Sequence, residues 1–214
     1  MTDKSYNWTS DPSLPAEANI TADHDAWRTL HRELKYDGLY AKVYQETVAT
    51  PARPEGVSWT VVRRKSALAI AAKTIDGLWL LIHQERVAIR QAIWEFPAGQ
   101  IETAPGDFST LLRETVWREL REETGYIRSA TSTLTPLGVF FPSAGFTDEH
   151  SHIFLADALV PHTDGAQPDE AESIVECRAF STAELRAMIA SGEIRDANTL
   201  ATVARLLALD LMRF

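Results

Sequence analysis

The chain has 214 residues, of which 45% are hydrophobic and 24% are charged, enough for one ordinary hydrophobic core and an additional arm. Its formal net charge of −9 at pH 7 argues against a nucleic-acid-binding scaffold, because phosphate binding needs a basic stripe. A small anionic ligand in a locally basic pocket remains compatible with this charge. The single cysteine excludes an intrachain disulfide, and we expect neither a transmembrane helix nor a signal peptide, hence a cytoplasmic protein.

The first part of the chain predicts a tail followed by a short helix. Residues 1–20 are polar and show no periodicity, which favours a loose tail. In the segment DHDAWRTLHREL, residues 23–34, the apolar side chains of Trp27, Leu30 and Leu34 recur at helical spacing.

A β-rich arm is expected next. Residues 38–50 and 57–65 are rich in β-forming side chains and are separated by the turn sequence TPARPEG, which predicts a pair of strands. We therefore assign the tail, the short helix and the first arm strand to residues 1–56, and the main domain to residues 57–214.

The centre of the chain predicts two buried strands, a loop and a helix. Residues 67–86 contain two short apolar runs joined by a turn at Asp76 and Gly77, as in a sheet covered on both faces. The segment WEFPAGQIE contains a proline and a glycine that favour a loop. The following STLLRETVWRELREETG predicts a helix with Ser109 as its N-cap and Gly125 as its stop.

The last part of the chain alternates strands and helices. Ser181 and Glu184 have the spacing of a capping box, which predicts a helix start. The expected elements are strands near 133–141, 150–160 and 174–180, a long polar loop over 161–173, and helices over 181–193 and 196–214.

The segment RELREETGY places three glutamates, Glu119, Glu122 and Glu123, on one face of the predicted central helix. Like charges at this spacing repel by about 0.2–0.5 kcal/mol per pair. One interpretation is a solvated face in which Arg118 pairs with Glu114 and Glu122. The other is a site for a hard divalent cation such as Mg²⁺, which takes oxygen ligands from one or two carboxylates and from substrate phosphates.

Together, PAGQIE and RELREETGY resemble the signature of the Nudix hydrolase family, a glycine followed downstream by Arg-Glu-aliphatic-x-Glu-Glu-x-Gly. The resemblance covers roughly residues 38–214, and Tyr126 stands where the family has an aliphatic residue. The matching positions of the second half are Arg118, Glu119, Leu120, Glu122, Glu123 and Gly125.

The loop between Gly99 and Arg118 departs from the family pattern. It carries about five extra residues within TAPGDFST. The family's middle glutamate has no clear counterpart, and Thr110 and Asp107 are the two candidates for its place.

The resemblance implies an α+β fold, the Nudix α/β/α sandwich with a mixed sheet, preceded by the β-rich arm. It also implies a Mg²⁺ cofactor, with Mn²⁺ as the other possibility. Glu119 and Glu123 would be the principal ligands, with Glu122 in support and the backbone carbonyl of Ala98 as a further ligand. Arg118 would hold the glutamates in place.

The flanking segments resemble the ADP-ribose pyrophosphatase branch of the family. FPSAGFTDE is similar to that branch's Ser-Pro-Gly-Phe-(Ser/Thr)-Asp-Glu loop, with Ala144 at the usual proline, and LLIHQER is similar to its strand ending in Gln-(Tyr/Phe)-Arg. GLYAKV and SWTVVRRK are similar to its arm, which implies aromatic stacking on the base and a homodimer. The residues implied in substrate binding are Tyr40, Trp59, Arg64, Arg86, Gly145 and Glu149.

Several assignments keep alternatives. Trp59 on a strand is also compatible with simple packing, and Arg63 is the alternative to Arg64. The cysteine, Cys177, has no visible His–acid partner, so we do not expect a thiol nucleophile.

The expected activity is Mg²⁺-dependent hydrolysis of ADP-ribose or a related nucleoside diphosphate sugar to AMP and a sugar phosphate. The resemblance places the general base in the polar loop, where Glu172 is the first candidate and Glu170 the alternative. Glu149, outside this loop, is a more distant alternative. The rival functions are a pyrophosphatase for UDP-glucose or GDP-mannose and a non-catalytic ADP-ribose-binding module. We expect no nucleic-acid or membrane partner.

Overall fold

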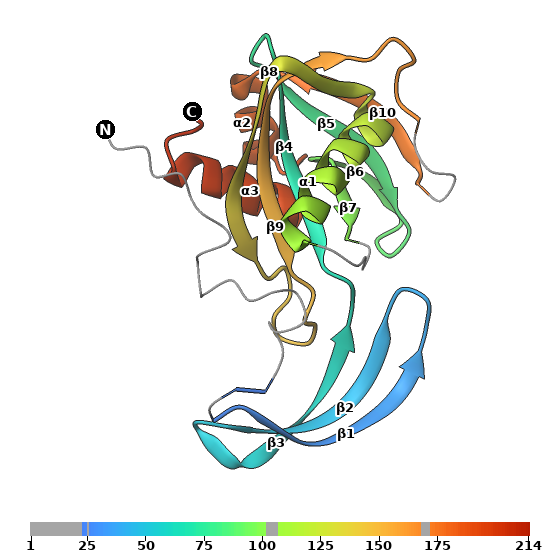
Figure 1. Ribbon diagram of the computed structural model, residues 1–214, viewed down its shortest axis with the longest axis vertical. Coiled ribbons are helices and arrows are strands. Elements are labelled where there is room, and N and C mark those ends of the chain that lie inside the picture. Colours follow the sequence, from blue (N-terminus) through green and yellow to red (C-terminus); the bar gives the residue numbers. More distant parts are fainter. Residues whose placement is uncertain (1–22, 25, 102–106, 168–171) are drawn as a thin grey trace. The chain divides into compact units, whose positions relative to one another are not determined.

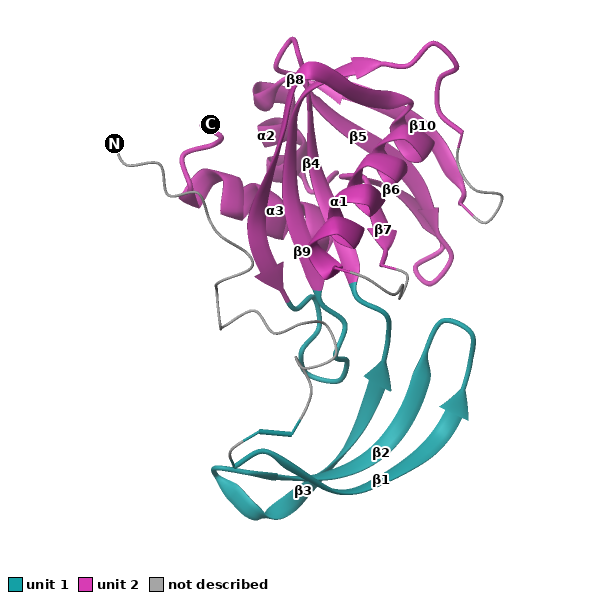
Figure 2. Cartoon of the chain, in the orientation of Figure 1, with its two compact units in different colours: residues 1–66, 141–150 teal, residues 67–140, 151–214 magenta. Residues whose placement is uncertain are grey.

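A computed structural model describes residues 23–24, 26–101, 107–167 and 172–214 (Figure 1). The predicted tail over residues 1–20 lies outside these ranges. The chain forms two compact units (Figure 2), of which unit 1 comprises Met1–Ser66 and Phe141–His150, and unit 2 comprises Ala67–Phe140 and Ser151–Phe214. The domain boundary placed between residues 56 and 57 stays a prediction, and both residues lie within one strand, β3. No helix in the described part of the chain is long and apolar enough to cross a membrane.

Unit 1 contains an antiparallel three-stranded sheet with the order β1-β2-β3. Its strands are β1 (Arg28–Asp37), β2 (Lys42–Thr50) and β3 (Arg53–Arg63). β2 and β3 correspond to the two predicted arm strands.

The short helix expected over residues 23–34 is wrong, because β1 begins at Arg28 and pairs with β2. The pairing register shifts twice, between Thr29 and His31 and between Leu34 and Tyr36. Each shift inserts a residue and breaks the simple alternation of a strand. The apolar spacing that imitated a helical period is therefore the spacing of an irregular strand.

Unit 2 is built on a mixed sheet of seven strands in which β4 and β9 run parallel. The central order is β10-β5-β4-β9-β8, while β6 pairs with β5 and β7 pairs with β4. The loop expected in WEFPAGQIE is therefore partly wrong, since it includes the end of β6 and all of β7. The strands are β4 (Ala67–Thr74), β5 (Trp79–Arg86), β6 (Gln91–Glu95), β7 (Ala98–Gln100), β8 (Tyr126–Phe140), β9 (Ser151–Pro161) and β10 (Ile174–Phe180).

Helices cover both faces of this sheet, as expected for an α/β/α sandwich (Figure 1). Strand β4 shows how the two cores arise, because its side chains alternate between faces. Leu68 and Ile70 pack in the core that includes Val116 of α1, whereas Ala71 packs in the core of α2 and α3. The helices are α1 (Phe108–Glu119), α2 (Thr182–Ser191) and α3 (Ala197–Ala208).

Two of the helix starts are informative. The capping box predicted at Ser181 and Glu184 is confirmed, with both reciprocal hydrogen bonds present. The cap expected at Ser109 is wrong: Asp107 has extended backbone and accepts a hydrogen bond from the Thr110 N–H, while the Ser109 hydroxyl bonds to Asp107. Asp is among the preferred N-cap residues, and its carboxylate here serves the first turn.

Candidate active site

The helix that carries the three glutamates does not stay α-helical. α1 ends at Glu119, and a π-helical turn, η2, covers Leu120–Thr124. A single α-helix through this region was expected, so this part of the prediction is wrong. π-turns are rare and occur often at functional sites. Here the turn carries Glu122 and Glu123, and it ends at Gly125 with a left-handed φ of 71°.

The carboxylates of Glu119, Glu123 and Glu172 form a compact group, here called the carboxylate cluster. Each offers one oxygen, and these oxygens lie within 4.8 Å of one another. Glu119 is 3% exposed and Glu123 is 1% exposed. Within the described residues, Glu119 Oε2 and Glu123 Oε1 are buried without a hydrogen-bond partner. Buried charges need a compensating partner, so the cluster has the chemistry of a cation site.

Burial dominates the electrostatics of the cluster. It raises the pKa of Glu119 to about 7, although the neighbouring Arg118 acts in the opposite direction. Burial also raises the pKa of Glu123 well above its usual range, and the charges of Glu119 and Glu172 add to this effect. A bound divalent cation would reverse this balance, because it favours the ionised form of each ligand.

The PAG segment packs directly against the cluster. A Cβ atom at Gly99 would overlap the carboxylate of Glu119, so a larger residue here would displace that side chain. The backbone N–H of Ala98 donates to Glu123 Oε2 at 2.9 Å. The backbone of this segment therefore fixes the two glutamates that the sequence singles out as metal ligands.

Gly125 connects the helix end to the loop that precedes Glu172. Its φ of 71° favours glycine, and a Cβ atom there would overlap the backbone at Gly165 and Ala166. The loop is tied to the helix end by hydrogen bonds from the His162 N–H to the Gly125 carbonyl (2.8 Å) and from the Gln167 N–H to the Glu122 carbonyl (2.9 Å). The alternative base Glu170 lies outside the described residues.

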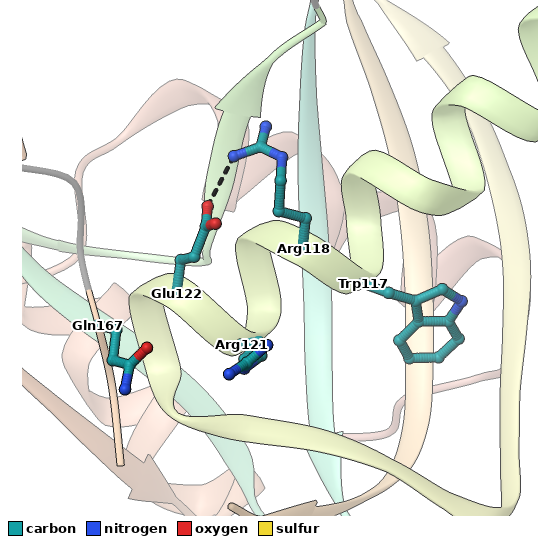
Figure 3. Close-up of a pocket in the computed structure, with 5 residues that line it drawn as sticks. All are labelled: Trp117, Arg118, Arg121, Glu122 and Gln167. Atoms are coloured by element: carbon teal, nitrogen blue, oxygen red, sulfur yellow. Dashed lines mark hydrogen bonds and ion pairs between the residues drawn. The ribbon is translucent and has the colours of Figure 1, made fainter. Parts of the chain in front are cut away.

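Glu122 is not part of the carboxylate cluster. It binds Arg118, whose guanidinium contacts Glu122 Oε2 and Glu119 Oε1, each at 2.6 Å. Figure 3 shows the Arg118–Glu122 ion pair at a surface pocket that Trp117, Arg121 and Gln167 also line. Arg118 thus links the cluster to a glutamate that lies further out.

Arg86 is held by a glutamate that the sequence reasoning missed. Its Nε donates to Glu95 Oε1 at 2.8 Å and its terminal nitrogen to Glu95 Oε2 at 2.6 Å, a bidentate pair. Glu95 is 1% exposed, and burial raises its pKa while Arg86 opposes the rise. A charged residue in the otherwise apolar segment IWEF is the signal that identifies it.

Cys177 of β10 is a partly buried free thiol. Burial raises its pKa to about 12, and the charges of Glu123 and Glu176 contribute to the rise. The thiol is therefore protonated at neutral pH, which agrees with the expectation that it is no nucleophile.

Unit 1 holds the remaining predicted substrate residues. Trp59 is 55% exposed, so it does not pack in a core, and its indole N–H donates to the Gly145 carbonyl at 2.7 Å. Tyr40 is also exposed. Arg64 pairs with Glu149 at 3.0 Å. Each of these side chains keeps its predicted role only as a hypothesis.

The model of the NUDIX domain matches residues 62–203, which is more than half of the chain. This chain belongs to the Nudix family. It is 31% identical over 172 residues to the ADP-ribose pyrophosphatase of Bacillus subtilis, an alignment that covers 80% of this chain and 88% of that protein. It is 30% identical over 147 residues to the methanol dehydrogenase activator of Bacillus methanolicus, covering 69% of this chain and 75% of that protein.

Two further comparisons agree with this Nudix assignment. The ADP-ribose pyrophosphatase of Mycobacterium tuberculosis is 32% identical over 138 residues, covering 64% of this chain and 62% of that protein. The crystal structure of an ADP compounds hydrolase superposes with a TM-score of 0.68 at 19% identity, covering 88% of this chain and 96% of that one. The Nudix fold is confirmed, and the chain is a hydrolase of this family.

Proposed function

We propose that this Nudix hydrolase cleaves ADP-ribose, or a related nucleoside diphosphate sugar, to AMP (or the corresponding nucleoside monophosphate) and a sugar phosphate, with Mg²⁺ as cofactor and Mn²⁺ as a possible substitute. The carboxylate cluster carries this proposal, because two of its oxygens are buried without hydrogen-bond partners among the described residues. Hard oxygen donors of this kind suit Mg²⁺. Two relatives named ADP-ribose pyrophosphatase, at 31% and 32% identity, support the choice of substrate.

In this proposal the site residues of unit 2 have distinct tasks. Glu119, Glu123 and the backbone carbonyl of Ala98 hold the cation, with Glu122 in support. When bound, the cation neutralises phosphate charge and makes a water molecule more acidic. Arg118 fixes Glu119 through its 2.6 Å ion pair, and Arg86 binds the diphosphate.

Glu172 serves as the general base that accepts the proton of the attacking water. Its carboxylate lies in the carboxylate cluster, where it is within reach of the other two carboxylates. This position is also suited to a metal ligand, and Glu170 and Glu149 stay the alternative bases. General-base assistance typically accelerates a reaction by about 10²–10⁴-fold.

Side chains of unit 1 contact the nucleoside and the sugar. Tyr40 and Trp59 present exposed aromatic rings, which stack on a base at roughly 1–3 kcal/mol each. Arg64, Glu149 and the backbone at Gly145 supply polar contacts. Stacking tolerates different bases, so UDP-glucose and GDP-mannose stay the alternative substrates. A non-catalytic module is disfavoured, because all three acidic positions of the helix are present.

We also propose a cytoplasmic homodimer without nucleic-acid or membrane partners. Among the described residues, β1 pairs with β2 only, so its other edge has no strand partner there. The same strand exposes Leu30, Leu34 and Tyr36. Open strand edges with apolar side chains favour pairing with another chain, and a second copy is the partner of matching surface.

Phosphate release from a panel of nucleotide sugars, with a phosphatase added to expose the product phosphomonoesters, tests the proposal. We expect ADP-ribose to be cleaved fastest and EDTA to abolish turnover. Glu123→Gln should lower turnover by at least about a hundredfold, since the metal supplies several kcal/mol of transition-state stabilisation. Glu114→Gln, the same change at an exposed position of α1, is the matched control.

Two results would contradict the proposal in different ways. Faster cleavage of UDP-glucose or GDP-mannose would reassign the substrate and keep the metal site. Near-normal turnover of Glu123→Gln with Mg²⁺ would remove the carboxylate cluster from the reaction.

A further inference from the structure

The loop of residues 141–150 is joined to β3 within unit 1. Its backbone forms a parallel bridge between Val62 and Thr147. The Val62 N–H donates to the Phe146 carbonyl at 2.8 Å, and the Asp148 N–H donates to the Val62 carbonyl at 3.3 Å. The loop is thus attached to the end of β3 by a single parallel bridge.

Asp148 is the loop residue whose side chain binds the end of β3. One carboxylate oxygen accepts a hydrogen bond from the Arg64 backbone N–H at 3.0 Å, and the other accepts one from the Arg63 guanidinium at 3.0 Å. The side chain therefore binds two consecutive residues of the chain through two different kinds of donor. A substitution that removes its charge weakens the side-chain bond more than the backbone bond, because only the former is charge-assisted on both sides.

Arg63 is in turn held from the opposite side by Glu46 of β2. Its terminal nitrogen lies 3.0 and 3.1 Å from the two carboxylate oxygens of Glu46. Glu46 is 3% exposed, and Arg32 of β1 also donates to it at 2.7 Å. A guanidinium fixed between two carboxylates has little freedom to move, so Arg63 transmits the position of β2 to the loop.

Trp59 and Arg64, which lie beside these hydrogen bonds on β3 and directly after it, are two of the residues proposed to bind the substrate. Trp59 donates its indole N–H to the Gly145 carbonyl in the middle of the loop, and Arg64 binds Glu149 near its end. We propose that Glu46, Arg63 and Asp148, here called the Asp148 clamp, are positioning residues that fix the Trp59 ring and the Arg64–Glu149 pair for substrate binding. The inference deepens the proposed function and rests on it, since the clamp acts through residues that are taken to contact the nucleotide sugar.

The Asp148 clamp makes a kinetic prediction that a purely structural role does not make. Asp148→Asn keeps the shape of the side chain and removes its charge. We expect KM for ADP-ribose to rise about tenfold while kcat stays within about threefold, because contacts with non-reacting parts of the substrate act on ground and transition states alike. Arg63→Gln should raise KM similarly, and the double variant should show less than the product of the two effects.

A second measurement reports on the environment of the Trp59 ring in the absence of substrate. With 5-fluorotryptophan incorporated, the ¹⁹F resonance of Trp59 is assigned by its absence in Trp59→Phe. It should shift or broaden in Asp148→Asn, while the resonance of the buried Trp79 stays in place. The matched control is Asp157→Asn, which removes a carboxylate that pairs with Lys73 in unit 2. This control should leave both KM and the Trp59 resonance unchanged.

The outcomes separate the clamp from the proposed function. An unchanged KM and an unchanged Trp59 resonance in Asp148→Asn would overturn the clamp, as would a loss of thermal stability without any change at Trp59. A shifted Trp59 resonance in Asp148→Asn together with a normal KM in Trp59→Ala would keep the mechanical link and reject the stacking role. If Asp148→Asn does not fold, Arg63→Lys keeps the charge and loses the fork geometry, and the same rise in KM and shift in resonance are required of it.

Discussion

Glu123 is almost fully buried, yet one of its oxygens has no hydrogen-bond partner among the described residues. Without a cation its ionised form is disfavoured, because burial and the charges of Glu119 and Glu172 raise its pKa well above the usual range. In its proposed role as a metal ligand, the residue would therefore serve metal binding at the expense of the stability of the metal-free protein.

We predict that Glu123→Gln separates these two effects. The neutral amide resembles the protonated acid and can still accept the Ala98 N–H, so the metal-free variant should be at least as stable as the parent protein. Mg²⁺ at about 100 times its dissociation constant should stabilise the parent by about 2.7 kcal/mol and the variant far less. Thermal melts in EDTA measure the stability of the metal-free proteins, and melts with Mg²⁺ measure the stabilisation by the ion. A melting temperature in EDTA that is lower for Glu123→Gln than for the parent protein would contradict this prediction.

At Glu172 the prediction concerns the general base. Glu172→Gln should lower kcat by about 10²–10⁴-fold, since it removes the proton acceptor, and leave KM nearly unchanged. Mg²⁺ affinity, measured by calorimetry, distinguishes the base from a metal ligand: weaker binding assigns Glu172 to the metal. If the variant keeps its kcat, the same substitution at Glu170 and at Glu149 tests the remaining candidates.

At the scale of elements, the π-turn η2 joins the helix to the loop before Glu172 through Gly125. We predict that Gly125→Ala destabilises the protein by more than the roughly 1–2 kcal/mol of a left-handed backbone, because its Cβ atom also meets the backbone at Ala166. It should also reduce kcat, since the displaced loop carries Glu172.

Gly192, at the end of α2, provides the matched control. Its φ is 78°, and a Cβ atom there meets nothing within 4 Å, so Gly192→Ala isolates the backbone strain. Urea unfolding gives the loss in free energy of unfolding for Gly125→Ala and for Gly192→Ala. The difference between the two losses is the cost of the close approach at Gly125. Equal losses of stability with equal activities would show that the loop does not depend on Gly125.

The elements were predictable where one local signal decided them. Leu112, Val116 and Leu120 form the apolar stripe of the central helix and are all buried, as their spacing indicates. The alternation within β1 was hidden by two register shifts that depend on its pairing with β2. The π-turn was not predictable either, because the apolar spacing and the stop at Gly125 are those of one continuous helix.

The site was predictable to a similar degree. The signature singled out Glu119 and Glu123, which lie together with Glu172 in the carboxylate cluster. Glu172 was singled out as the general base, and that role stays a prediction. Glu95 and Asp148 were not predicted, because their partners, Arg86 and Arg63, come from other strands or from distant parts of the sequence. Contacts of that kind depend on strand register, which residue type and spacing alone do not fix.

At the scale of the whole molecule, the edge of β1 that has no strand partner within the described ranges makes the oligomeric state testable. Leu34→Lys places a charge among the exposed apolar side chains of this strand. We predict that the parent protein is a dimer by light scattering and that the variant is a monomer, since charged edge residues oppose strand pairing. Lys35→Glu changes charge at the neighbouring exposed position and is the control. A monomeric parent protein would reject the proposal.

The make-up of the carboxylate cluster has a consequence for metal selectivity. Soft ions such as Zn²⁺ or Cd²⁺ gain most from thiolate ligands, whereas hard ions such as Mg²⁺ gain most from oxygen ligands. The described residues that could hold an ion together are Glu119, Glu123 and Glu172, and Cys177 is not among them. A group of carboxylate oxygens without a sulfur atom favours hard cations over soft ones, so the choice of ion would follow from the type of donor atom that the fold brings together.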